Sequence, residues 1–165
     1  MTVGKNDSGF TLIELLVSMA ILGILSTLGL GTFRSSQIKS RDAIRKSDLG
    51  SIQKALEMYQ SDNGVYPSSN SSGQIVIASI PLDIPLDWSG RVQFIDPDQT
   101  KGTVYMQELP NDPHVSPSYC YISIGSAYKL YAKLENTNDL QRLPVNVSCN
   151  SVDYNYGVSS SNTKP

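Results

Sequence analysis

One long apolar segment near the N-terminus constrains the fold of this chain more than any other feature. From Phe10 to Phe33 the sequence reads FTLIELLVSMAILGILSTLGLGTF, and Glu14 is its only charged residue. About 20 apolar residues are enough for a helix to cross a bilayer, so the segment predicts a transmembrane helix over residues 10–33. A carboxylate in such a helix is costly, which indicates a functional role for Glu14.

Two other interpretations of the chain fit less well. The apolar core of a secretory signal peptide has about 7 to 15 residues and precedes a small-residue cleavage site; this run is longer and no A-x-A sequence follows it. The net charge of -2 and the pI of about 5.3 argue against a nucleic-acid-binding protein, which needs a basic surface.

The helix is predicted to continue beyond the apolar segment, as an amphipathic half over residues 34–62. This stretch contains no proline, and Asn63-Gly64 provides a stop signal. Asp42 and Lys46 are four residues apart and are predicted to pair on the surface. One apolar stripe recurs at steps of three and four residues: Leu49, Ile52, Leu56 and Tyr59.

The rest of the chain predicts short strands and loops. Residues 63–118 are rich in proline, serine and glycine, and are predicted to be irregular with short strands at Gln74–Ile80 and Arg91–Ile95. Val104–Leu109 is predicted to form a helical turn. Residues 150–165 are predicted to be a flexible tail.

An antiparallel sheet is predicted over residues 119–149. Tyr119–Ile124 and Ala127–Leu134 flank Gly125-Ser126, a hairpin signal, and Val145–Cys149 is predicted as a third strand. The fold class is therefore α+β, a long N-terminal helix packed on a small antiparallel sheet. The side of the hairpin that faces the helix is predicted to carry Cys120, Ile122, Ile124, Tyr128, Leu130, Ala132 and Leu134.

The chain has two cysteines, Cys120 and Cys149. In an oxidising compartment they are predicted to form a disulfide; the alternative is a pair of buried thiols. The bridge would close a loop of about 30 residues and contribute roughly 3 to 4 kcal/mol in the loop-entropy treatment.

The string Gly9-Phe10-Thr11-Leu12-Ile13-Glu14 resembles the class III signal of type IV pilins and type II secretion major pseudopilins. Similarity to that family extends through residues 35–43 and 55–67. The resemblance implies that a prepilin peptidase removes residues 1–9 as a leader, cutting between Gly9 and Phe10, and N-methylates Phe10.

The resemblance also implies how the protein functions. It predicts a structural subunit, not an enzyme, that polymerises into a helical fibre, either a type IV pilus or a type II secretion pseudopilus. Glu14 would neutralise the buried amine of Phe10 in a neighbouring subunit. A simpler role is that Glu14 interacts with the positive end of the helix dipole. The alternative function is a membrane-anchored binding module, or minor pilin, that does not polymerise.

Localisation and partners follow from the same resemblance. It implies a single-pass protein of the cytoplasmic membrane with its C-terminal domain outside, and later an extracellular or periplasmic fibre. The partners would be further copies of the chain, the peptidase, and the assembly platform with its ATPase. The basic residues after the apolar segment, beginning with Arg34, predict the opposite orientation by charge alone.

No cofactor is predicted from the residues themselves. The lone His114 and the absence of a Cys/His cluster argue against a zinc site and against nucleophilic catalysis. Major pseudopilins of the family bind calcium in a C-terminal loop. Here Glu135–Asp139 offers oxygen atoms, but no ordered ligand spacing marks it as a calcium site.

Overall fold

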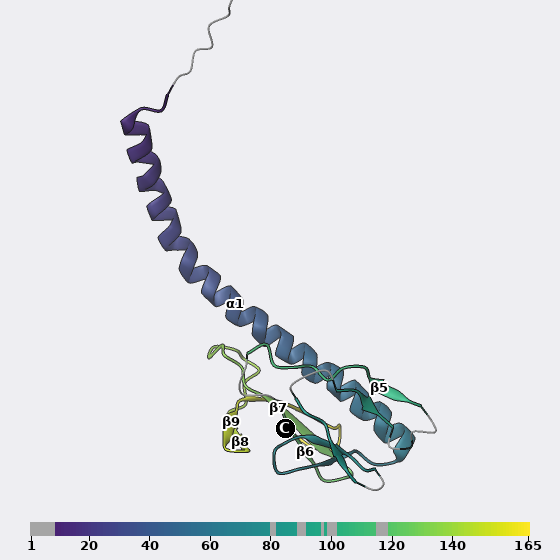
Figure 1. Cartoon of the computed structure of the whole chain (residues 1–165). Coiled ribbons are helices and arrows are strands. Elements are labelled where there is room, and N and C mark those ends of the chain that lie inside the picture. The colour runs from purple at the N-terminus through teal and green to yellow at the C-terminus, as the bar shows by residue number, and fades with distance from the viewer. Residues whose placement is uncertain (1–8, 80–81, 89–91, 97, 99–101, 115–118) are drawn as a thin grey trace, which may run out of the picture. The chain divides into compact units, whose positions relative to one another are not determined.

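The chain has an α+β fold with one long helix followed by small antiparallel sheets, as predicted (Figure 1). The computed structural model describes residues 9–79, 82–88, 92–96, 98, 102–114 and 119–165, except the side chains of 28–32. It divides into an N-terminal unit, Met1–Ile38, and a C-terminal unit, Lys39–Pro165. The predicted leader lies outside the described residues, apart from Gly9.

Helix α1 runs from Leu12 to Asn63, a length of 52 residues. It ends where the sequence predicts, because Gly64 adopts a φ of +77° and its N–H donates to the carbonyl of Gln60 at 2.8 Å. In the part of the chain that the structure describes, no helix is both long and apolar enough to cross a membrane. The transmembrane helix over residues 10–33 stays a prediction.

The apolar stripe of α1 forms the centre of the core of the C-terminal unit. Leu49, Ile52 and Leu56 are fully buried, and Tyr59 is nearly so. The ring of Tyr59 stacks on Phe94, with ring centroids 5.4 Å apart. The predicted amphipathic pattern is thus confirmed, and it fixes which face of α1 the strands cover (Figure 1).

Three short strands follow the helix: β1 (Ser68–Ser69), β2 (Ile75–Ile77) and β3 (Ile84–Pro85), paired in the order β1-β2-β3. Next, β4 (Phe94–Ile95) pairs with β5 (Val104–Met106). The helical turn predicted at Val104–Leu109 is wrong. Pairing with β4 holds this segment extended and buries Tyr105 in the core.

The main sheet has the order β10-β7-β6 and is antiparallel. The predicted hairpin is confirmed as β6 (Cys120–Ser123) and β7 (Tyr128–Ala132), and β10 (Tyr156–Ser159) is added on the other side of β7. The register pairs Tyr121 with Leu130, which differs from the predicted assignment of faces. A shift of one residue exchanges the two faces of a strand, so Tyr119 and Tyr121, not Cys120 and Ile122, face the helix.

The C-terminal residues contain two strands, so the flexible tail predicted over 150–165 is wrong. After β10 the chain stays close to the sheet, and Ser160 is buried. The predicted third strand, Val145–Cys149, is also placed differently: β8 (Val147–Cys149) pairs with β9 (Val152–Tyr154) in a separate hairpin. Strand β10 pairs along the free edge of β7. This pairing orders a segment whose polar sequence alone does not indicate a strand.

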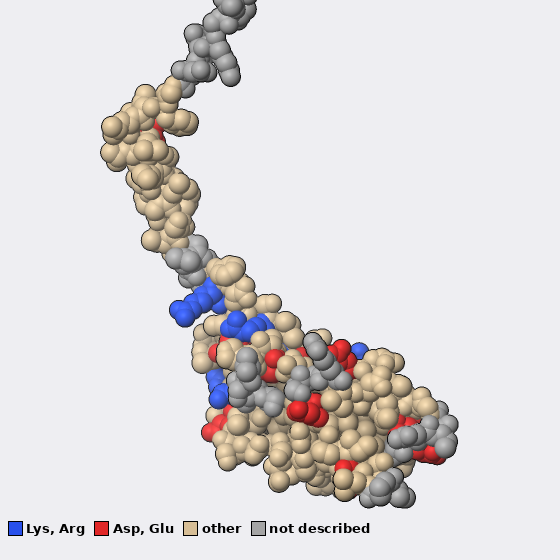
Figure 2. Space-filling model, viewed as in Figure 1, with Lys and Arg blue, Asp and Glu red and all other residues tan. Residues whose placement is uncertain are grey.

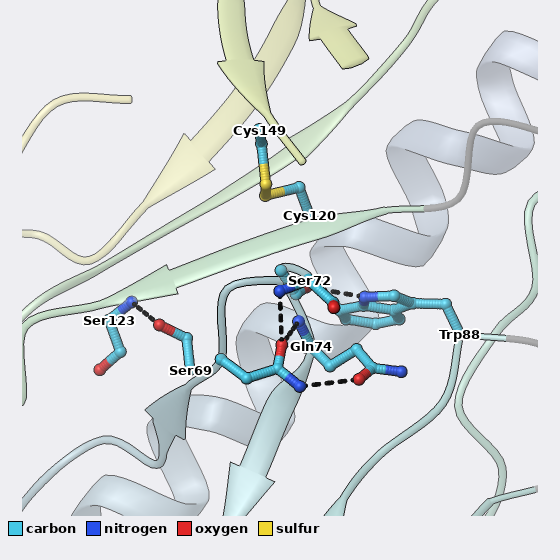
Figure 3. Close-up of a disulfide and its surroundings, with 9 residues drawn as sticks. Ser69, Ser72, Gln74, Trp88, Cys120, Ser123 and Cys149 are labelled. Atoms are coloured by element: carbon cyan, nitrogen blue, oxygen red, sulfur yellow. Dashed lines mark hydrogen bonds between the residues drawn. A yellow bond between two sulfur atoms is a disulfide. The ribbon is translucent and has the colours of Figure 1, made fainter. Parts of the chain in front are cut away.

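Cys120 and Cys149 form a disulfide, as predicted, which joins β6 to the β8–β9 hairpin. The bridge packs on the loop before β2, drawn beneath it in Figure 3. There the carbonyl of Gly73 accepts two hydrogen bonds, from the N–H of Tyr121 and from Nε1 of Trp88, each 2.8 Å long. The disulfide therefore joins two segments of the unit and packs on a third, which hydrogen bonds hold in place.

Candidate functional site

The first candidate site is the exposed apolar segment in the N-terminal unit. Its large side chains are exposed over about half or more of their surface, from 88% at Phe10 to 49% at Val17. Figure 2 shows this surface as almost entirely uncharged. Contiguous apolar surface of this extent marks an interaction site. The exposed members are Phe10, Leu12, Ile13, Leu15, Leu16, Val17, Met19, Ile21, Leu22, Ile24, Leu25 and Phe33.

Hydroxyl groups in the segment bond within the helix itself. Ser18 donates to the carbonyl of Leu15 at 2.9 Å, and Ser26 donates to the carbonyl of Leu22 at 2.7 Å. Thr27 makes the same kind of bond one turn back. Because these hydroxyls donate to carbonyls of the same helix, the side chains can enter apolar surroundings without leaving a hydrogen-bond donor unpaired. The segment is thus suited to burial against other apolar surfaces.

Glu14 completes a capping box with Thr11, which the sequence interpretation missed. The backbone N–H and the hydroxyl of Thr11 both donate to Oε2 of Glu14 at 2.8 Å, and the N–H of Glu14 faces the Thr11 hydroxyl at 3.3 Å. The signal was readable as Thr-x-x-Glu at the start of an apolar run. Among the described residues, both hydrogen bonds to the Glu14 carboxylate are accepted by Oε2, which leaves Oε1 to meet another group.

The structure brings together some of the predicted site residues. Gly9 and Phe10 lie exposed just before the helix, and Glu14 lies in its first turn. The cleavage and methylation predicted at Gly9-Phe10 stay predictions, since no feature of the structure tests them. Cys120 and Cys149 are joined. His114 donates its backbone N–H to Asp112, at 2.8 Å.

A second candidate is a cluster of charges in the C-terminal unit, centred on Arg45. The guanidinium is 2% exposed and contacts three carboxylates. It donates to Oδ1 of Asp42 at 2.8 Å, to both oxygens of Asp112 at 2.8 and 2.9 Å, and to Oε1 of Glu135 at 2.7 Å. Arg41 forms a bidentate salt bridge with the same Glu135. In Figure 2 basic and acidic side chains of this unit adjoin one another.

This cluster corrects the predicted surface pair between Asp42 and Lys46. Asp42 is buried, and it accepts the backbone N–H groups of Glu135 and Asn136 at 2.9 and 2.8 Å. Lys46 contacts Asp139 instead, at 2.7 Å. Tertiary partners replace the local i,i+4 pair because a buried charge is costly unless it is paired and hydrogen-bonded, and Asp42 is buried beside Arg45. No sequence signal identifies these long-range partners.

The charge cluster lowers the pKa of two partly exposed carboxylates, Glu135 and Asp139. The hydrogen bond from Arg41 is the main cause that lowers the pKa of Glu135 to about 2. The hydrogen bond from Lys46 likewise lowers the pKa of Asp139. Both carboxylates are therefore held in the charged form at neutral pH, as their pairing requires.

Comparison with known proteins identifies the family. Residues 4–30 match the profile of the prokaryotic N-terminal methylation motif, and residues 33–133 match that of the type II secretion system (T2SS), protein G. The chain belongs to the type II secretion protein G family. This confirms the resemblance given by Gly9, Phe10 and Glu14. The protein G profile ends before Glu135.

Curated relatives agree with this assignment. The chain is 32% identical to the type II secretion system core protein G of Pseudomonas aeruginosa over 122 residues, which are 74% of the chain and 78% of that protein. It is 30% identical to the core protein G of Aeromonas hydrophila over 76% of the chain and 80% of the relative. The Vibrio cholerae protein is 27% identical over 73% and 74% of the two chains. No solved structure matches the chain.

The protein G family is a family of structural subunits. In the described ranges, no group of three or more His, Cys, Asp or Glu side chains is arranged to hold a metal ion. The two candidate sites are of different kinds. The apolar segment offers a surface for other molecules, whereas the Arg45 cluster holds the fold of the C-terminal unit together.

Proposed function

We propose that this chain is a subunit of a type II secretion pseudopilus, assembled through the segment from Phe10 to Phe33. The observation that carries the proposal is the long exposed apolar surface directly behind a prepilin methylation motif. The protein G profile and the curated relatives favour a pseudopilus over a type IV pilus. They also disfavour a binding module that never polymerises.

The driving force for assembly is burial of this surface against the same segment of other copies. Fully burying a large aliphatic or aromatic side chain contributes about 1.5 to 3 kcal/mol, and many such side chains are exposed here. Part of this free energy is offset by the loss of translational and rotational freedom on association. The remainder is large enough to hold a fibre without covalent links.

Glu14 would fix the axial offset between neighbouring subunits in the fibre. Cleavage between Gly9 and Phe10 creates an ammonium group that becomes buried as the fibre forms. Oε1 of Glu14 in a neighbour would accept a hydrogen bond from it, while Oε2 stays in the capping box with Thr11. Leaving either charge without its partner in an apolar interior costs about 3 to 5 kcal/mol.

Before assembly, the apolar segment would anchor the subunit in the cytoplasmic membrane, with the C-terminal unit outside. A bilayer is the environment that covers such a surface when no other copy does. The prepilin peptidase, the assembly platform and its ATPase would then act on the anchored form. The fibre would occupy the periplasm.

Processing is tested by co-expression with a prepilin peptidase. We expect the mature chain to begin at Phe10 and to carry the added mass of one methyl group, measured by intact mass spectrometry and N-terminal sequencing. A chain that keeps Met1, or is cut elsewhere, contradicts the proposal.

Assembly is tested separately with Glu14→Ala. We expect normal processing but loss of sheared fibres, because the Phe10 amine loses its partner. Glu108→Ala removes an exposed carboxylate of the C-terminal unit and serves as the control that assembles normally. Fibres in normal amounts from Glu14→Ala would refute the role of that carboxylate.

A further inference from the structure

The loop from residue 135 to 142 lies where the family resemblance implies a calcium site. Calcium takes six to eight oxygen ligands in a flexible shell, mostly carboxylates and carbonyls. Whether this loop suits the ion depends on what its oxygens contact. All of its residues are described, so each donor and acceptor can be followed.

The carboxylates in and around the loop are occupied by protein N–H donors. Both oxygens of Glu135 accept from Arg41, and Oε1 also accepts from Arg45. Asp139 accepts from Lys46 at Oδ2 and from the backbone N–H of Gln141 at Oδ1, at 2.7 and 2.9 Å. A divalent ion would have to displace a cation from each carboxylate.

Several neutral oxygens of the loop are also engaged. The side-chain carbonyl of Asn136 accepts the N–H of Asn138 at 3.1 Å, and the backbone carbonyl of Thr137 accepts from Arg142 at 3.0 Å. The side-chain carbonyl of Gln141 accepts from Lys46 at 2.8 Å. The donor set therefore does not fit calcium. The loop is folded around cationic side chains and its own N–H groups.

We propose that Arg45 and Lys46 of α1, with Arg41, fix this loop in place of a metal ion, so that the fold of this chain is independent of calcium. A calcium ion can connect a loop to its surroundings by gathering carboxylates from several segments. Arg45 does the same here, because it joins Asp42 of α1, Asp112 of a distant loop and Glu135 at the start of this one.

Lys46 extends the same function to the far end of the loop. Its ammonium contacts Asp139 and Gln141 and lies 5.5 Å from the centre of the Tyr156 ring, in strand β10. One side chain thus connects α1, the loop and the main sheet. The protein G profile stops at residue 133, so this loop belongs to the part of the chain outside the matched range.

The test uses the full chain purified in detergent. Its thermal unfolding and the hydrogen exchange of amides 135–142 are measured in excess EDTA and then in excess calcium chloride. We expect the same midpoint and the same exchange rates in both. A lower midpoint or faster loop exchange in EDTA would overturn the proposal.

A variant separates the cationic side chains from any other cause of loop order. Lys46→Met should speed the exchange of the Gln141 amide at least several-fold, with or without calcium. Lys54→Met removes an exposed charge from the same helix, away from the loop, and should leave the rate unchanged. Equal rates in the two variants would contradict the role of Lys46. Lys46 is preferred to Arg45 here because it is partly exposed, so its loss is less damaging to folding.

Discussion

Replacing Gly73 by alanine tests how closely the disulfide packs on the loop beneath it. Gly73 has a φ of +73°, and a Cβ there would lie 2.7 Å from the sulfur of Cys120 and 2.8 Å from that of Cys149. The loop cannot easily retreat, because the carbonyl of Gly73 is held by Tyr121 and Trp88. The substitution therefore combines an unfavourable backbone conformation with a steric clash.

The size of the effect follows from these two causes. A left-handed conformation costs a non-glycine residue about 1 to 2 kcal/mol, and overpacking a filled site costs typically about 1 to 3 kcal/mol. We therefore expect Gly73→Ala to lower the free energy of unfolding by about 2 to 5 kcal/mol. The assay is denaturant unfolding of the oxidised chain.

Gly64→Ala is the matched control for the clash. Gly64 has a similar φ of +77°, but nothing lies within 4 Å of the position of its Cβ. It should therefore show the backbone cost alone. If the two variants lose the same stability, the contact with the disulfide is not what makes Gly73 necessary.

A second comparison isolates the sulfur atoms. Replacing Cys120 and Cys149 together by alanine should itself cost about 3 to 4 kcal/mol by the loop-entropy treatment. It should also reduce the further cost of Gly73→Ala, because the atoms that the new methyl group meets are gone. Strictly additive costs would show that the two sites do not interact.

Two further predictions concern Glu135 and Tyr119 of the C-terminal unit. Since the folded pKa of Glu135 lies near 2, below its usual 4.5, its stabilising effect is full above about pH 5 and is lost as pH falls towards 2. Glu135→Gln should flatten that acid limb in unfolding curves and Glu108→Gln should not; identical curves would contradict the role of the pair with Arg41. The hydroxyl of Tyr119 donates to Asp48 at 2.5 Å, so Tyr119→Phe should cost about 1.5 to 3 kcal/mol, and an unchanged unfolding midpoint would count against that bond.

The parts of the fold set by local pattern were predictable. The end of α1 at Asn63 and its buried stripe follow from spacing within a single helix. The methylation motif is a contiguous string, and the capping box of Thr11 and Glu14 was readable in the same way. The paired cysteines required only that their compartment be oxidising.

The parts of the fold set by long-range pairing could not be predicted from the sequence. The face of β6 depends on a register that the hairpin loop fixes, and one residue of error turns Tyr121 outward and Cys120 inward. Residues 152–154 are ordered by pairing with β8 and residues 156–159 by pairing with β7, not by their own polar sequence. Arg45 meets partners 67 and 90 positions away, and a helical charge pattern suggested only a local pair.

The single tryptophan of the chain gives it a built-in optical reporter. Trp88 is buried. Its indole N–H donates to the carbonyl of Gly73, which also accepts the N–H of Tyr121 and lies beside the disulfide. Its emission depends on how polar its surroundings are, so opening of this corner exposes it to water and shifts the spectrum. Reduction of the disulfide and refolding of the C-terminal unit can therefore be followed by fluorescence without attaching a dye.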